Sequence, residues 1–286
     1  MPFLDLLEPR DRSAEIQQCI DHLNPDSPQD YRELAAYLVH IWRTRGLKTI
    51  GLGGGQGAGK TTLSRLIVES GAYYGEHIQI LGLDDFYHTK ETRNQLAKTV
   101  HPLLETRGPP GTHDIQLLIN ALTSLSDGKT FRVPIFNKGT DDREGSVVVE
   151  GGVDRIVIEG WCIGATPFPA EQLAEPVNSL ERLEDADCAW RSHIRLALVE
   201  HYQKLNETMD CLAFLKVPSL DSVKAWRLEQ ERDRLPEQRM TAEQVDRFIQ
   251  YYERITLWML EDTTRTADIV VDLNTDHNID KIDTRI

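Results

Sequence analysis

The chain has 286 residues, 40% of them hydrophobic, which is enough apolar material for one sizeable core. Its formal net charge of -14 argues against nucleic-acid or anionic-membrane binding as its main task, because those partners carry charge of the same sign. An acidic protein can still bind an anion, but only in a locally positive pocket. The four cysteines show no metal-type spacing and fit a reduced, cytosolic set.

The first residues, MPFLDLLEPRDRSAE, are acidic early and contain no long apolar run. They therefore resemble neither a secretory signal nor an organelle transit peptide. No stretch of the chain reaches the roughly 18 continuous apolar residues that a membrane span needs. We expect a soluble, cytoplasmic protein.

The predicted elements alternate between helices and short apolar strands. The first helix follows a capping pattern at Ser27, Pro28 and Asp30, and it ends at Gly46. Core strands are predicted over residues 48–52, 78–87, 155–161, 211–217 and 267–274. Helices are predicted over residues 61–71, 114–125, 180–206, 222–235 and 242–260. Two further strands, FRVPIF and SVVVEG, predict a hairpin beside an α/β sheet that is mostly parallel, five-stranded and flanked by helices.

The stretch after the first strand, GLGGGQGAGKTTLSRL, is unusually rich in glycine. It satisfies G-x-x-x-x-G-K-[ST] with Gly54, Gly55, Gln56, Gly57, Ala58, Gly59, Lys60 and Thr61, and Thr62 follows. Such glycines let backbone N–H groups approach phosphate oxygens, and the next helix adds its positive dipole end. We expect Lys60 to reach the β- and γ-phosphates and the Thr61 hydroxyl to ligate Mg²⁺. The motif predicts nucleotide binding, in a kinase, an ATPase or a GTPase.

A GTPase would need an N-K-x-D segment to recognise guanine. Residues 137–140 read Asn-Lys-Gly-Thr, which lacks the aspartate, and they precede the third core strand instead of following it. We therefore reject a GTPase and expect ATP as the phosphoryl donor.

Three acids end predicted strands, at the edge of the sheet where α/β proteins place their ligands. Asp84 and Asp85 end the second strand. A carboxylate there can accept the proton of an attacking hydroxyl, or it can cap a following helix. Glu159 ends the third strand, where P-loop proteins keep an acid for Mg²⁺ and its waters; the alternative is a buried acid paired with a lysine.

Several segments resemble known kinases. Residues 84–87, Asp-Asp-Phe-Tyr, resemble the Asp-x-Phe-Tyr of uridine-kinase-type nucleoside kinases, which implies that Asp84 is the catalytic base. Residues 107–114, RGPPGTHD, resemble the R-G-x-x-G-[ST]-H-D signature of plant- and fungal-type D-glycerate 3-kinases. VPIFNK, IEGWCIG and WRLE resemble further segments of that family and begin at residues 133, 158 and 226.

This resemblance covers most of the chain and implies a P-loop kinase fold with a small β-hairpin insertion and a helical lid near residues 222–240. It implies one domain over residues 1–286, with residues 1–46 as a helical extension and residues 47–286 as the nucleotide-binding core. Residues 178–202 are longer than in plant-type enzymes and look more like bacterial members. They lie where an acceptor pocket or its cover could be altered.

An acidic protein must concentrate positive groups to hold both ATP and an acceptor carboxylate. Arg107 and His113 lie in a Pro/Gly-rich loop, and arginine can grip a carboxylate with two parallel hydrogen bonds. We expect Arg107 and His113 to bind the acceptor with help from Lys138, and Asp85 and Tyr87 to line the same site. Arg107 and His113 could instead only pin their loop by bonding its carbonyls.

The predicted helix over residues 222–235 carries Arg227 and Arg234 on one face, with Arg232 offset from them. Arginines over a transferred phosphoryl group stabilise its spreading negative charge. We expect Arg227 to do so, because it also lies in a family-like segment. For Arg232 and Arg234, a solvated charged face is the alternative.

The sequence thus predicts an ATP-dependent kinase that uses Mg²⁺ and transfers the γ-phosphoryl group to a hydroxyl of a hydroxy acid, foremost D-glycerate, giving 3-phosphoglycerate. The alternatives are a kinase for a nucleoside or pantothenate-like acceptor, and a nucleotide-dependent switch ATPase. The expected partner is a small molecule, with neither nucleic acid nor membrane. The sequence sets no oligomeric state.

Overall fold

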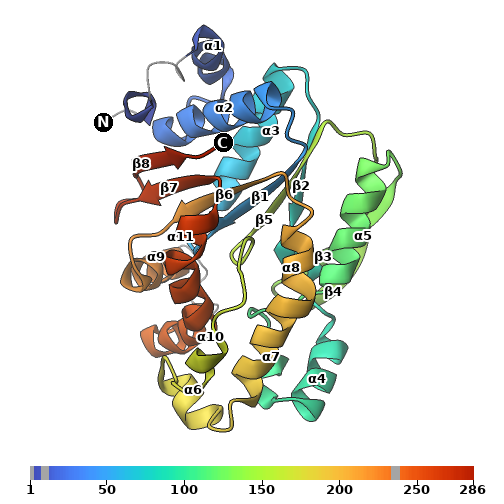
Figure 1. Cartoon of the computed structure of the whole chain (residues 1–286), viewed down its shortest axis with the longest axis vertical. Helices are drawn as coiled ribbons and strands as arrows, with labels where there is room; N and C mark the ends of the chain where they lie inside the picture. Colours follow the sequence, from blue (N-terminus) through green and yellow to red (C-terminus); the bar gives the residue numbers. More distant parts are fainter. Residues whose placement is uncertain (1–2, 8–12, 233–238) are drawn as a thin grey trace.

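A six-stranded sheet forms the centre of the molecule, in the spatial order β2-β5-β1-β6-β7-β8 (Figure 1). The computed structural model describes residues 3–7, 13–232 and 239–286. The strands are β1 (Thr49–Gly54), β2 (Ile78–Gly82), β5 (Arg155–Gly160), β6 (Cys211–Lys216), β7 (Ile269–Leu273) and β8 (Ile279–Thr284). The first five are the predicted strands and run parallel, so the mostly parallel sheet is confirmed. β8 is an additional edge strand, antiparallel to β7.

β1 occupies the middle of the sheet, between β5 and β6. Leu52 lies opposite Glu159 of β5 and Ala213 of β6. Ile50 and Leu52 are fully buried, as expected for a parallel strand that is covered on both faces. The carboxyl end of β1 therefore delivers residues 54–61, the glycine-rich loop, to the centre of the sheet edge.

The strand predicted over residues 78–87 is shorter than expected. β2 ends at Gly82, opposite Glu159, and Leu83–Phe86 form a 3-10 turn. In such a turn, residues three apart share one side, and Leu83 and Phe86 are both fully buried. Asp84 and Asp85 lie between them and remain partly exposed at the sheet edge.

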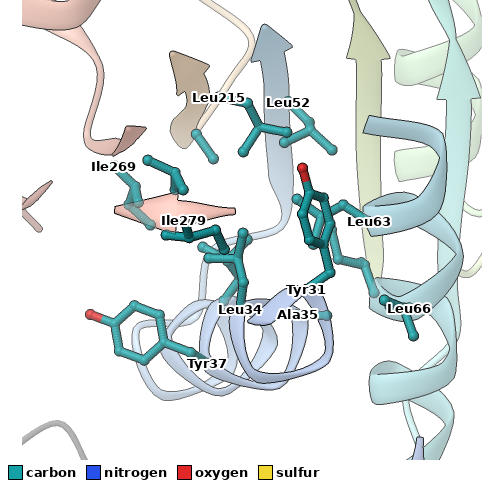
Figure 2. Close-up of a cluster of buried hydrophobic side chains, with 14 of the residues drawn as sticks. Tyr31, Leu34, Ala35, Tyr37, Leu52, Leu63, Leu66, Leu215, Ile269 and Ile279 are labelled. Carbon is teal, nitrogen blue, oxygen red and sulfur yellow. The ribbon is translucent and has the colours of Figure 1, made fainter. Parts of the chain in front are cut away.

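Helices α1 (Ala14–His22), α2 (Gln29–Thr44) and α3 (Lys60–Tyr73) pack on one face of the sheet (Figure 1). The sequence predicted α2 and α3 but did not predict α1. Figure 2 shows Leu34 of α2, Leu63 of α3 and Ile279 of β8 in one apolar cluster between α2 and the strands. The N-terminal helices therefore share the main core with the sheet.

The capping pattern predicted for the start of α2 is wrong. The helix has Pro28 at its N-cap, without a side-chain capping hydrogen bond. Ser27 Oγ instead accepts a hydrogen bond of 2.9 Å from Arg65 Nη2, and Asp30 Oδ2 accepts one of 3.0 Å from Ile279 N. Partners in α3 and β8 thus use the oxygens that a local cap would have used.

The opposite face is covered by α5 (Ile115–Ser126), α7 (Ala189–Ala197), α8 (Gln203–Asn206) and α10 (Ala242–Glu261) (Figure 1). Residues 180–206, predicted as mainly helical, are divided into α6 (Ser179–Glu184), α7, a π-helix (Leu198–Tyr202) and α8. The chain turns between α6 and α7 at Cys188, which has a φ of 65°. Asp185 stabilises that turn by accepting a hydrogen bond of 2.7 Å from Trp190 N.

The predicted hairpin is confirmed as β3 (Phe131–Asn137) and β4 (Asp142–Val149), an antiparallel pair apart from the main sheet. The remaining helices are α4 (Lys90–Thr99), α9 (Leu220–Arg232), α11 (Thr263–Thr266) and the 3-10 helices Phe3–Leu6, Pro102–Glu105 and Ala170–Leu173. α10 starts with a capping box formed by Thr241 and Gln244. Among the helices of residues 3–7, 13–232 and 239–286, none is long and apolar enough to cross a membrane.

Candidate active site

The glycine-rich loop connects β1 to α3, as its motif predicts. Lys60, the first residue of α3, folds its side chain back over the loop: its Nζ donates to Gly54 O at 2.8 Å and to Gly55 O at 2.9 Å. Thr61 follows on the first turn of α3 with an exposed side chain. An ammonium group, a helix N-terminus and a free hydroxyl therefore lie together at the sheet edge.

Two aromatic residues from distant parts of the chain hold this loop. Tyr31 of α2 donates its hydroxyl hydrogen bond to Ala58 O at 3.0 Å. Gly57 has a φ of 81°, and a Cβ added there would lie 2.9 Å from Trp226 Cβ of α9. The loop is thus packed between α2 and α9, the helix that the sequence assigns to the lid. No local pattern in the sequence predicted the contacts of Tyr31 and Trp226 with this loop.

The groups around the loop fit a polyphosphate and a hard divalent cation. Burial lowers the pKa of Lys60, whereas the carboxylates of Glu159 and Asp84 act in the opposite direction. Thr61 offers an oxygen ligand, and Glu159 offers a carboxylate of the kind that Mg²⁺ accepts. The helix N-terminus adds partial positive charge, which favours phosphate.

Asp84 lies beside this loop and beside the β3–β4 hairpin. Its Oδ2 is 2.7 Å from Nζ of Lys138, and its side chain is 43% exposed. Burial alone would raise the pKa of Asp84, but the charge and hydrogen bond of Lys138, with smaller effects of His113 and Lys60, hold it below the ordinary value. Asp84 is therefore ionised at neutral pH and can accept a hydrogen bond from a hydroxyl.

Glu159 belongs to the same electrostatic group. Burial raises its pKa, Lys60 lowers it, and the neighbouring charge of Asp84 raises it further. The charge of Asp84 thus acts on Glu159, and Lys60 and Lys138 act on both acids. The structure brings together the predicted base, the predicted metal ligand and the motif lysine.

Asp85 and Tyr87 make packing and backbone contacts next to Asp84. Asp85 Oδ1 accepts a hydrogen bond of 3.2 Å from Phe136 N, which ties the hairpin to the 3-10 turn, and burial raises the pKa of Asp85. The ring of Tyr87 is 3% exposed and stacks on His113, with 4.1 Å between ring centroids. Both residues thus hold neighbouring segments beside Asp84: Asp85 holds the hairpin, and Tyr87 holds the His113 ring.

The side chain of Arg107 contacts the β3–β4 hairpin and not its own loop. It donates to Asp141 Oδ1, and its guanidinium is 5.5 Å from the ring centroid of Phe136. Arg93 of α4, fully buried, donates to the other oxygen of Asp141 at 2.8 Å. Two arginines therefore share one carboxylate. No local pattern in the sequence marks Arg93 or Asp141, so neither residue was predicted at the site.

His113 is buried, with 4% of its surface exposed, and its Nδ1 lies 2.7 Å from the Tyr202 hydroxyl. Burial lowers the pKa of His113 to about 3, so the ring is neutral. The loop itself is held by other groups: Trp161 Nε1 donates to Gly108 O at 3.1 Å, and Thr112 Oγ1 donates to Pro109 O at 2.7 Å. The side-chain partners of Arg107 and His113 thus lie outside the loop.

Arg227 lies on α9 and faces α10. Its Nη2 is 2.6 Å from Oε1 of Glu231, which is 4% exposed, and its guanidinium is 5.0 Å from the ring centroid of Phe248. Arg232 is the exposed last residue of α9. Arg234 lies outside the described residues, as does the part of the predicted lid over residues 233–238. The catalytic role of Arg227 therefore stays a prediction.

Comparisons with known proteins agree with this fold. Residues 49–166 match the model of the phosphoribulokinase/uridine kinase family. The chain is 31% identical over 195 residues to the chloroplastic D-glycerate 3-kinase of Arabidopsis thaliana, across 64% of this chain and 40% of that protein. It is 27% identical over 219 residues to the uncharacterized kinase mug58 of Schizosaccharomyces pombe, across 71% of this chain and 77% of that protein.

The fold is similar to a solved D-glycerate 3-kinase from Cryptococcus neoformans var. grubii, with a TM-score of 0.71 and 25% identity. That alignment covers 95% of this chain and 99% of the solved chain. In contrast, the chain spans 40% of the length of the Arabidopsis relative. The glycine-rich loop, the mostly parallel sheet and these similarities mark the chain as an ATP-dependent P-loop kinase that is similar to D-glycerate 3-kinases.

Proposed function

We propose that this kinase phosphorylates a hydroxyl group of a small hydroxy acid, and that the acid is D-glycerate, giving 3-phosphoglycerate. The observation that carries the proposal is the ionised carboxylate of Asp84, 2.7 Å from Lys138 and close to Lys60 of the nucleotide loop. A base between a phosphoryl-donor site and a group of cations suits an acceptor that has both a hydroxyl and a carboxylate. The substrate in the names of the Arabidopsis and Cryptococcus relatives supports this choice.

On the donor side, residues 54–62 bind the phosphates of ATP and Lys60 contacts the β- and γ-phosphates. Thr61 and Glu159 would hold Mg²⁺, which supplies positive charge against the phosphate oxygens when it is bound. The exposed hydroxyl of Thr61 and the carboxylate of Glu159 suit this ion, because Mg²⁺ prefers oxygen ligands.

Asp84 orients the acceptor hydroxyl and accepts its proton as the phosphoryl group is transferred. Because the pKa of Asp84 is lowered, its carboxylate is a weak base, and orientation is the larger part of its role. Lys138 is 60% exposed, so its ammonium group can move from Asp84 to the carboxylate of an incoming acid.

Arg107 and His113 complete the acceptor site. Arg107 shares Asp141 with Arg93, and two guanidinium groups against one carboxylate leave an excess of positive charge. That excess favours an anionic acceptor over a neutral nucleoside. Asp85 and Tyr87 position the hairpin and the His113 ring around the acceptor.

Arg227 acts from the lid side. We infer that its guanidinium, held between Glu231 and Phe248, turns toward the transferred phosphoryl group when ATP is bound. There it would stabilise the negative charge that spreads over the phosphoryl oxygens and would help to exclude water.

An acceptor panel tests the proposal. ADP release is measured with ATP and Mg²⁺ alone and with added D-glycerate, uridine, pantothenate or a sugar, and NMR identifies the phosphorylated carbon of any product. We expect D-glycerate to stimulate turnover strongly and to be phosphorylated on carbon 3. Full-rate ATP turnover without an acceptor would instead indicate a switch ATPase, and preferential uridine or pantothenate phosphorylation would reject the hydroxy-acid assignment.

A further inference from the structure

Residues 178–202, the segment that is longer than in plant-type enzymes, contact residues 107–114, the proposed acceptor loop. It ends in the π-helix Leu198–Tyr202, a rare helix type that occurs mostly as single turns and often at functional sites. Tyr202, the last residue of that turn, lies directly before α8 and is buried in the core, with 1% of its surface exposed. The Tyr202 hydroxyl lies 2.7 Å from Nδ1 of His113.

A second contact joins the same segment to the same loop. A Cβ added to Gly111 would lie 2.7 Å from Nε2 of His193, on α7. Two side chains of the segment thus contact residues 107–114: His193 from α7 and Tyr202 from the π-helix.

Among the described residues, Nδ1 of His113 is the hydrogen-bond partner of the Tyr202 hydroxyl. A buried phenol O–H is unfavourable without an acceptor, and an imidazole nitrogen is a good acceptor. The consistent arrangement is therefore Tyr202 donating to Nδ1 of His113.

A neutral imidazole has one protonated nitrogen, so a ring that accepts at Nδ1 carries its proton on Nε2. Within the described residues, His113 Nε2 is buried and has no hydrogen-bond partner. A buried donor without a partner is unfavourable unless a ligand completes it. The ring interacts electrostatically with Asp84 and stacks on Tyr87, which places it at the acceptor site.

We propose that Tyr202 is a positioning residue that holds His113 in its Nε2–H form, so that His113 donates a hydrogen bond to an oxygen of the acceptor. This proposal rests on the proposed function, because it takes the acceptor to lie beside Asp84 and His113. It assigns a role to the longer segment: the segment sets which ring nitrogen carries the proton and thereby selects an acceptor with a hydrogen-bond-accepting oxygen at that point.

Kinetics provide the first test. Tyr202→Phe removes only the hydroxyl and is expected to raise the KM for D-glycerate roughly three- to tenfold while the KM for ATP stays unchanged. Tyr37→Phe is the matched control, since it removes another buried tyrosine hydroxyl, 3.0 Å from Thr284 Oγ1 in the core beside β8. An unchanged KM for D-glycerate in Tyr202→Phe, or an equal rise in Tyr37→Phe, would overturn the proposal.

The second test needs no acceptor. In ¹⁵N-histidine-labelled protein, with His113→Gln used to assign the signals, His113 should show a protonated Nε2 and an Nδ1 that accepts a hydrogen bond. In Tyr202→Phe the Nδ1 signal should lose its hydrogen-bond shift. A proton on Nδ1 in the wild-type chain would overturn the proposal.

A pair of substitutions separates the two ring nitrogens. His113→Gln can place an amide donor near the position of Nε2, whereas His113→Asn places its amide near Nδ1. Gln should therefore retain more affinity for D-glycerate than Asn, and adding Tyr202→Phe to His113→Gln should raise the KM no further. Equal losses with Gln and Asn would overturn the donor role. If D-glycerate is not the acceptor, the panel fails while the NMR result still decides the role of Tyr202.

Discussion

At the level of single residues, Asp84 combines two opposing influences. Burial raises its pKa, whereas Lys138 at 2.7 Å, followed by His113 and Lys60, lowers it, and the result lies below the ordinary value. A carboxylate of this kind is ionised at physiological pH and is poised to accept a hydrogen bond. Asp85, one position later, uses its carboxylate to hold the hairpin. Adjacent aspartates thus have separate tasks.

Asp84→Asn should lower kcat by about 10²- to 10⁴-fold with little change in the KM for ATP, because the amide lacks both the negative charge that orients the acceptor hydroxyl and the ability to accept its proton. Asp85→Asn is the matched control: it should lose less than about tenfold in kcat and mainly lower the Tm, since it weakens the bond to Phe136 N. Steady-state kinetics and thermal melts measure both. A near-normal kcat for Asp84→Asn would remove this residue from the chemistry.

Lys138→Ala should raise the pKa of Asp84, because burial then acts with less opposition from positive charge. The carboxylate is the active form, so the acidic limb of the kcat/KM profile should move to higher pH in the variant. The KM for D-glycerate should also rise more than that for ATP. Lys129→Ala, which removes an exposed ammonium paired with Asp127, serves as the control. An acidic limb at the wild-type position would contradict the assignment.

At the level of elements, the glycine-rich loop depends on two helices that flank it. Tyr31 of α2 bonds to Ala58 O, and Trp226 of α9 packs against Gly57. Trp226 is fixed in turn by its Nε1 hydrogen bond of 2.9 Å to Thr275 O and by stacking on His277. Trp226 of α9 therefore packs against the glycine-rich loop. The next residue, Arg227, points toward Phe248 of α10.

Gly57→Ala should weaken ATP binding at least about tenfold, because its Cβ would lie 2.9 Å from Trp226 Cβ and displace the loop. Gly75→Ala is a matched control, since Gly75 has a φ of 73° and nothing within 4 Å of an added Cβ. Both variants should lose about 1–2 kcal/mol of stability from left-handed backbone strain. Calorimetric titration with ATP separates them, and equal ATP affinities would show that the close approach to Trp226 is unimportant.

At the level of the whole molecule, helix α2 near the start of the chain packs against β8, the edge strand near its end. Asp30 of α2 bonds to Ile279 N at the start of β8, and the Tyr37 hydroxyl meets Thr284 Oγ1 at its end. Figure 2 shows the apolar side chains of α2, α3 and β8 in one cluster. Because Tyr31 on the same helix holds the nucleotide loop, the packing of the N-terminal helix is connected to the donor site.

Leu34→Ala should therefore cost about 2–5 kcal/mol of unfolding free energy, because Leu34 is fully buried in that cluster. Leu183→Ala, at a position that is 77% exposed, should change stability by less than about 0.5 kcal/mol. Denaturant titration measures both values. A small loss in Leu34→Ala would mean that the N-terminal helix is a dispensable addition to the core.

Local pattern accounts for the elements that were predicted. The five parallel strands are apolar runs, and α3 and α10 start at readable motifs. β8 was missed because its sequence, IDKIDT, has only two apolar residues, as an edge strand tolerates. The strand over residues 78–87 was drawn too long because the buried Leu83 and Phe86 of the 3-10 turn continue the apolar run.

The sequence by itself determined the alternating α/β fold, the phosphate loop and the acids at the strand ends, because each depends on residues that are neighbours in the chain. Only the tertiary structure decided how the remaining charges and rings pair. Arg107 meets Asp141 across 34 positions, Arg93 meets it across 48, and Tyr202 meets His113 across 89. Such partners come together only when helices pack on the sheet. In the packed structure Lys138 keeps Asp84 ionised, and burial keeps His113 neutral.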